Sequence, residues 1–179
     1  GDEELVSFLS SKAACFQLAN PKDSPAKIRE NITTGIMQHV LDEPRKISSN
    51  FPNTEATQLV SQAVLGWPEN RDQVIADLQT MLEKVTAVDG LSGEKGLGGY
   101  AAIAPRLVAG VLVLFSRLDP DLLPEMVRRV PGIVQMFRFH ADVWIAGTLV
   151  PRIGDTAGFG LHDAGYLGAN FTRSPFDLE

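Results

Sequence analysis

The sequence predicts an all-α fold made of antiparallel helical hairpins. Apolar residues recur at helical spacing through most of the chain, the segments between these periodic runs are short, and no run alternates with the two-residue period of a strand. A chain of 179 residues can bury a substantial core in one domain but is short for two. We therefore expect residues 1–179 to form a single unit that ends in a long irregular C-terminal segment.

The first two helices are predicted from their apolar faces. The first is expected over residues 3–18, where four apolar residues share one face: Leu5, Leu9, Ala13 and Phe16. The second follows Ser24, a favourable N-cap, and stops before Pro44, and its apolar residues are spaced by four positions: Ile28, Ile32, Ile36 and Val40. The single cysteine, Cys15, belongs to the apolar face of the first helix, which predicts that it is buried.

The third and fourth helices have the most regular apolar spacing. The third is predicted over residues 56–67, with Thr54 as its N-cap and its apolar face toward the core. Pro68 is expected to open the fourth helix, whose apolar residues recur over 74–85. Asp89-Gly90 is expected to end it, because glycine favours the conformation that follows a helix.

The last predicted helices differ in character. The fifth, from about Tyr100 to Arg117, is apolar nearly all round, which predicts a position between neighbouring helices. Pro120 starts a sixth helix. We expect it to kink or split at Pro131-Gly132 before it continues over 133–144, because proline cannot donate the backbone hydrogen bond that a helix interior needs.

The composition excludes several classes of function. A net charge of −6, from 16 basic and 22 acidic residues, provides no overall attraction to nucleic acid or anionic lipid. The most apolar run, residues 107–115, is shorter than the about 20 residues that cross a bilayer. The three histidines lack the spacing of metal ligands. We therefore expect no nucleic-acid partner, no membrane partner, and no metal or other cofactor in this chain.

Two loop segments carry candidate functional residues near predicted helix starts. Arg45, Lys46 and Asn50 lie just before the third helix, whose N-terminus favours an anion such as a carboxylate. The alternative is an exposed basic loop with Asn50 in a turn. The glycine-rich segment 89–99 ends at Tyr100, where a phenol at a pocket edge could transfer protons. The alternative there is a core tyrosine with a satisfied hydroxyl.

A third segment, residues 150–160, holds Arg152 and Asp155 in a loop whose path is defined by proline and glycine residues. These two side chains either form a structural ion pair or line a site. The paired alternative requires no ligand at all.

Taken in order, three motifs resemble the heparinase II/III-like polysaccharide lyases. They are Lys-Ile-x-x-Asn before a helix, a later Asp-Gly-…-Glu-…-Gly-Tyr loop, and Pro-Arg-Ile-Gly-Asp-Thr-Ala-Gly near the end. The resemblance spans residues 2–160 and implies an incomplete α/α toroid followed by β-sandwich domains. The chain would then be the central part of the toroid, and its first residues look like a cut within a longer protein. The resemblance also implies a periplasmic or secreted location.

The resemblance implies β-elimination on an acidic polysaccharide, in which the uronate C5 proton is removed and the bond to the C4 oxygen breaks. By motif position, Asn50 would bind the carboxylate and stabilise the developing enolate, and Tyr100 would act as general base, general acid or both. Five further residues are candidates for substrate binding: Arg45, Lys46, Arg106, Arg152 and Asp155. The first three of these are also the candidates to supply the positive charge that a tyrosine with a pKa of about 10 needs to act as a base.

The chain departs from the family pattern at two positions. Family members commonly carry a histidine directly after the asparagine or a few positions beyond, where this chain has Phe51 and Thr54. Other catalytic histidines of the family lie outside this segment, so we expect the isolated chain to be inactive. One alternative is a non-catalytic helical scaffold or glycan-binding module. Another is a glycoside hydrolase on a similar toroid, which requires paired carboxylates from three candidates: Glu55, Glu94 and Asp155.

Overall fold

A computed structural model of the chain describes residues 2–91 and 100–142. These residues form helices and contain no strand, and one isolated antiparallel bridge joins Val88 to Leu91. The all-α prediction is therefore confirmed for the described part of the chain. The toroid, the single-unit organisation and the irregular C-terminal segment stay predictions.

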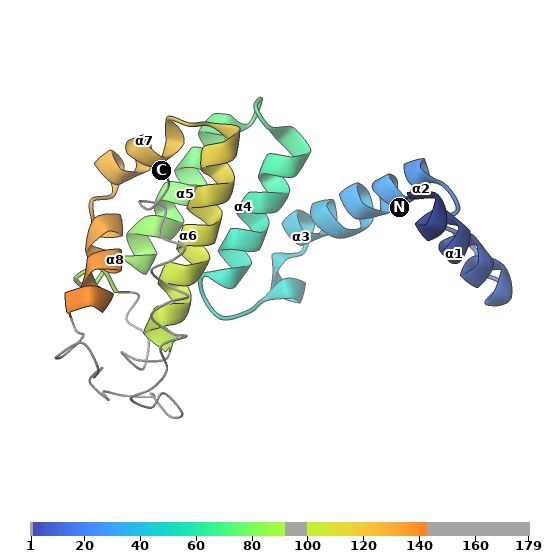
Figure 1. The fold of residues 1–179 in the computed structure, drawn as a ribbon, viewed down its shortest axis with the longest axis horizontal. Coiled ribbons are helices and arrows are strands. Elements are labelled where there is room, and N and C mark those ends of the chain that lie inside the picture. The colour runs from blue at the N-terminus through green and yellow to red at the C-terminus, as the bar shows by residue number, and fades with distance from the viewer. Residues whose placement is uncertain (1, 92–99, 143–179) are drawn as a thin grey trace.

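The main body is a bundle of five helices (Figure 1), in which α4 packs against both α5 and α6, and α8 packs against α5, α6 and α7. The helices α4 (Asn53–Gly66) and α5 (Arg71–Val85) form an antiparallel hairpin. The chain then returns in α6 (Tyr100–Leu118), against which α7 (Leu122–Arg129) and α8 (Gly132–Asp142) pack. Successive antiparallel helices were predicted from the short connections, and the bundle confirms this arrangement.

The core lies inside this bundle and draws on every one of its helices. The helix α5 buries an apolar residue every three or four positions, as its sequence period predicted. The largest fully buried side chains come from all five helices and include Leu59, Leu78, Leu82, Leu112, Phe115, Met126 and Met136. These side chains pack in one core, and this packing fixes the relative positions of α4, α5 and α6 and of their ends.

The predicted break before α8 is confirmed, and its cause is partly a close contact. Helix α7 ends at Arg129 and α8 begins at Gly132, directly after Pro131. A Cβ atom added to Gly132 would lie 2.6 Å from the Thr86 hydroxyl oxygen, closer than packed atoms approach. A residue without a side chain therefore lets the start of α8 contact the end of α5.

Two predicted helix starts were wrong by a few residues. Helix α4 begins at Asn53, so Thr54 lies inside the first turn and is not its N-cap. Helix α5 begins at Arg71, three residues after Pro68. In both places a proline precedes the helix, and the chain makes a turn before the first helical hydrogen bond: Ala56 N–H donates to the Pro52 carbonyl and Val74 N–H to the Asn70 carbonyl.

The N-terminal helices project from the bundle (Figure 1). Helix α1 (Asp2–Cys15) is followed by α2 (Pro25–Glu30), which Ser24 caps as predicted by accepting a hydrogen bond from Lys27 N–H. The apolar face of α1 is largely exposed, and 69% of Phe16 is accessible. The predicted burial of Cys15 was wrong, because its side chain is exposed. An apolar period shows which residues share a face but not whether another helix covers it.

The second predicted helix is continuous but changes its geometry midway. After α2, residues Asn31–Gln38 form a π-helix, η1, and His39–Asp42 form α3. The four-residue spacing of the apolar positions is wider than the 3.6-residue turn of an α-helix, and a π-helix has the wider turn. The structure thereby keeps Ile36 and Val40 on one side, where both line a groove against the bundle.

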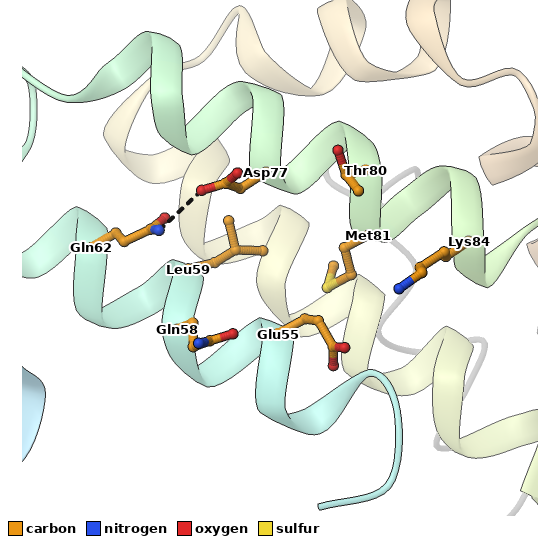
Figure 2. Close-up of a pocket in the computed structure, with 8 residues that line it drawn as sticks. All are labelled: Glu55, Gln58, Leu59, Gln62, Asp77, Thr80, Met81 and Lys84. Atoms are coloured by element: carbon orange, nitrogen blue, oxygen red, sulfur yellow. Dashed lines mark hydrogen bonds between the residues drawn. The ribbon is translucent and has the colours of Figure 1, made fainter. Parts of the chain in front are cut away.

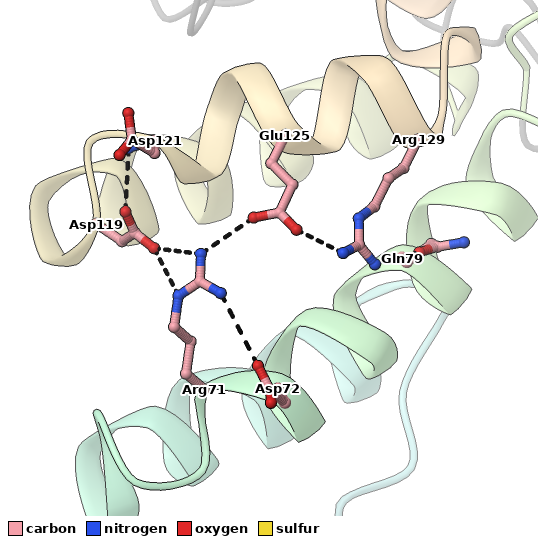
Figure 3. Close-up of polar contacts among 7 residues, drawn as sticks. All are labelled: Arg71, Asp72, Gln79, Asp119, Asp121, Glu125 and Arg129. Carbon is pink, nitrogen blue, oxygen red and sulfur yellow. Dashed lines mark hydrogen bonds and ion pairs between the residues drawn. The ribbon is translucent and has the colours of Figure 1, made fainter.

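A cluster of charged side chains joins the start of α5 to α7 (Figure 3). The Arg71 guanidinium contacts the carboxylates of Asp119 and Glu125, and Glu125 also pairs with Arg129. These contacts raise the pKa of Arg71, chiefly through its hydrogen bonds to Asp119 and Glu125. The cluster fixes α7 relative to α5 at the end of the bundle opposite the predicted site.

Candidate functional site

The N-terminal ends of α4 and α6 lie at the same end of the bundle (Figure 1). Helix α5 runs antiparallel to both of its neighbours, so α4 and α6 point in the same direction. The loop that leads into α4 and the first turn of α6 are therefore at one end, although about fifty residues separate them in the sequence. Two helix N-termini at one end of a bundle favour negative charge there.

The predicted cations of the first loop are exposed on a short 3₁₀ helix, η2 (Pro44–Ile47). Lys46 pairs with Glu43 of the same turn, at 3.4 Å between Nζ and Oε1. Arg45 has no ion-pair partner within the described residues. Both positive charges are thus accessible, and an exposed pair such as that of Lys46 holds its partners only weakly.

Asn50 is exposed in the turn between η2 and α4. Its backbone carbonyl accepts a hydrogen bond from Asn53 N–H at 2.9 Å, while its side-chain amide has no hydrogen-bond partner in the part of the chain that the structure describes. The turn is also held by Thr54, whose hydroxyl oxygen accepts from Ser49 N–H at 2.9 Å. The geometry therefore leaves the amide of Asn50 available to a ligand. It equally fits the alternative of an exposed turn residue.

Phe51 occupies the position next to Asn50 and serves the fold. Its ring packs against the buried core, and the Lys84 ammonium lies 5.8 Å from its centroid. A cation over an aromatic face contributes roughly 0.5–1 kcal/mol at an exposed site. At the position where the family has a histidine, this chain thus has a packing residue.

A groove of about 740 Å³ opens between the η1–α3 segment, α4 and α6. Its walls are mostly apolar, and Arg106 of α6 is the one cationic side chain among its lining residues. The groove leaves Ile103 and Leu114 exposed, so the prediction that α6 is enclosed by neighbours was wrong for this side of the helix. Its described lining includes Asn53, which sequence reasoning overlooked, but not Asn50, Arg45 or Lys46.

Three of the predicted site residues are not tested by these contacts. Tyr100 is the first residue of α6, but its side chain lies outside the described part of the structure. Arg152 and Asp155 lie outside the described residues altogether. The arrangement of these three side chains around a ligand stays a prediction.

No group of three or more histidine, cysteine, aspartate or glutamate side chains is placed to hold a metal ion within residues 2–91 and 100–142. Across the same residues, none of the helices combines the length and apolar character that crossing a membrane requires.

Comparisons with known protein families, with characterised proteins and with solved structures find no match to this chain. The resemblance to heparinase II/III-like lyases therefore rests on the three sequence motifs.

Proposed function

We propose that this chain is part of a polysaccharide lyase that cleaves uronate-containing polysaccharides of the heparan sulfate or alginate kind by β-elimination. The observation that carries the proposal is the parallel direction of α4 and α6. It brings the exposed amide of Asn50 and the first turn of α6, with Tyr100, to one end of the bundle. The helix N-termini there favour the carboxylate of a uronate.

The proposed reaction begins with the uronate carboxylate bound by the Asn50 amide. Tyr100, as phenolate, takes the C5 proton, and the electron pair of that bond moves onto the carboxylate as an enolate. The pair then forms the C4–C5 double bond as the bond to the C4 oxygen breaks. The leaving oxygen takes a proton from Tyr100. Arg45, Lys46 or Arg106 supplies the positive charge that favours the phenolate.

Arg152 and Asp155 complete the proposal as substrate-binding residues, on the strength of the motif around them. A periplasmic or secreted location is part of the same proposal, because polysaccharides of this kind are extracellular. The chemistry proposed uses side chains alone, and no cofactor in this chain is invoked.

A non-catalytic scaffold or glycan-binding module is the alternative, and one observation favours it. Phe51 packs against the core and Thr54 holds the turn that contains Ser49, so neither position offers a group for proton transfer. A chain that retained the fold and lost the histidine would bind glycan without cleaving it.

The test measures unsaturated products by their ultraviolet absorbance. The 179-residue chain, and any longer protein in which it occurs, are incubated with heparan sulfate and with alginate. Activity should fall about 100-fold or more in Tyr100→Phe and also in Asn50→Ala. Asn20→Ala, which removes an exposed asparagine from the α1–α2 connection, should leave it unchanged.

Full activity in Tyr100→Phe would show that the tyrosine assignment is wrong. Binding of these glycans without any unsaturated product, in the longest form of the protein, would favour the scaffold and end the lyase proposal. Products with saturated ends would indicate a hydrolase instead.

A further inference from the structure

A second, smaller pocket lies between α4 and α5, and its lining shares no residue with the groove or with the set proposed for elimination. It has a volume of about 290 Å³. Figure 2 shows its polar side chains projecting from the two facing helices, with Glu55 and Gln62 on α4 and Asp77 and Lys84 on α5. The pocket is a feature of the hairpin itself, because both walls come from adjacent helices.

Two oxygen atoms of the pocket residues are buried without a hydrogen bond. They are Oε2 of Glu55 and Oε1 of Gln62. The orientation of the Gln62 amide is set by Asp77, because Gln62 Nε2 donates to Asp77 Oδ2 at 3.0 Å. Buried acceptors without partners are costly and uncommon in folded proteins. A ligand that donates hydrogen bonds would satisfy both atoms.

Donor groups lie beside these acceptors. Gln58 has no hydrogen bond within the described residues, so its amide can both donate and accept. Lys84 carries an ammonium near the same pocket and has no ion-pair partner in the described part of the chain. The second carboxylate, Asp77, already accepts one hydrogen bond on each oxygen, because its Oδ1 accepts from Gln73 at 2.9 Å and its Oδ2 from Gln62. The pocket therefore offers a mixture of donors and acceptors.

Apolar side chains close the pocket between its polar walls. Leu59 and Met81 line it but are each only 2% exposed, so they offer little surface to a ligand. A hydroxylated ring suits a pocket of this kind because its hydroxyls both donate and accept hydrogen bonds. An ammonium ligand would leave the donors of Gln58 and Lys84 unused, and a carboxylate ligand would be repelled by Glu55 and Asp77.

We infer that the pocket between α4 and α5 binds a neutral sugar unit, with the buried oxygens of Glu55 and Gln62 accepting hydrogen bonds from its hydroxyls. The site would recognise an uncharged sugar and is thus separate from the proposed binding of a uronate by Asn50. Its occupation needs neither elimination chemistry nor Tyr100.

The test is a titration of the isotope-labelled chain with four neutral sugars, followed by nuclear magnetic resonance: glucose, galactose, mannose and N-acetylglucosamine. The side-chain amide signals of Gln58 and Gln62 should shift in a saturable way with at least one of them, in the millimolar range expected for a single sugar in a small pocket. Glu55→Ala and Gln62→Leu should each weaken binding about tenfold or more.

Glu83→Gln is the matched control, because Glu83 is an exposed carboxylate on α5 that does not line the pocket. It should bind sugar as the original chain does. Circular dichroism of each variant checks that the helices are intact. A second measurement guards against a variant that fails to fold: Glu55→Gln, which keeps the shape of the half-buried side chain and replaces its carboxylate with an amide, should be at least as stable as the original chain.

Three outcomes would overturn the inference. One is the absence of any saturable shift with all four sugars, which would mean that no sugar hydroxyl hydrogen-bonds to the buried oxygens of Glu55 and Gln62. Another is stronger binding of methylammonium or of galacturonate than of any neutral sugar. The third is unchanged sugar binding in both pocket variants. Because Tyr100→Phe and Asn50→Ala should bind the neutral sugar normally, failure of the elimination proposal would be seen separately.

Discussion

The guanidinium of Arg71 lies 2.7 Å from the carboxylate of Asp119, although forty-eight positions separate the two residues. The contact joins the first residue of α5 to the loop before α7, and the same guanidinium reaches Glu125 at 3.0 Å. The side chains of Asp119 and Glu125 are only 16% and 18% exposed, so water hydrates their carboxylates poorly. The positive charge of Arg71 offsets much of this lost hydration.

Replacing Arg71 with methionine should therefore lower the free energy of unfolding by about 1–3 kcal/mol, because two partly buried carboxylates lose their shared cation. Urea unfolding measures the change. Arg128→Met on α7 is the control, since Arg128 is exposed and outside the cluster, and it should change the stability by less than about 0.5 kcal/mol. Equal effects of the two substitutions would contradict a stabilising role for the cluster.

Gly90 is expected to tolerate no side chain. Its φ of +86° is one that other residues rarely adopt, and an added Cβ would lie 2.6 Å from the backbone nitrogen of Met136. Gly90→Ala should cost about 2 kcal/mol or more in thermal or urea unfolding. Gly110→Ala is the opposite case, because open space surrounds that position within α6, and it should stabilise the chain by about 0.5–1 kcal/mol. The reverse order of stabilities would contradict the close contact between Gly90 and the backbone of α8.

Substituting an exposed and a buried phenylalanine tests whether the N-terminal helices contribute to the core. Phe16 is 69% exposed and Phe115 is fully buried. Phe115→Ala should lower the free energy of unfolding by about 3–5 kcal/mol, whereas Phe16→Ala should change it by less than about 0.5 kcal/mol. A large loss from Phe16→Ala would mean that the apolar face of α1 is covered in solution.

Asp23 should titrate below its ordinary range. Its carboxylate lies 2.8 Å from the Lys27 ammonium, and the hydrogen bond from Lys27 lowers the pKa of Asp23 from 3.8. A group whose folded-state pKa is depressed contributes stability above its unfolded-state pKa, and this contribution is lost as the pH falls through the folded-state pKa. Nuclear magnetic resonance titration of Asp23 measures the shift. The shift should disappear in Lys27→Met and persist in Lys22→Met.

Much of the helical layout could be predicted because its signals are local. The Ser24 cap, the period of α5 and the break at Pro131 each depend on residues within one or two helical turns, and the structure confirms all three. Helix starts after proline were less accurate, since Thr54 has a favourable cap side chain but uses it to hold Ser49.

Local sequence signals predicted only part of the candidate site. Residues such as Asn50 stand out because they precede a helix, and the structure confirms that this amide is exposed and unpaired within the described residues. The pocket between α4 and α5 was missed because Gln62 and Asp77 are ordinary polar positions of two amphipathic helices. Their hydrogen bond, and the pocket beside it, form only when α4 and α5 pack against each other.

The amino-acid sequence by itself determined that the described part of the chain is helical and, to within a few residues, where most of its helices stop, because capping, proline placement and apolar period act over a few residues. Only the tertiary structure decided which apolar faces are covered, that α4 and α6 start at the same end, and that the oxygens of Glu55 and Gln62 are buried without partners. Burial and proximity depend on which distant helices pack together, and no local pattern in the sequence specifies that choice.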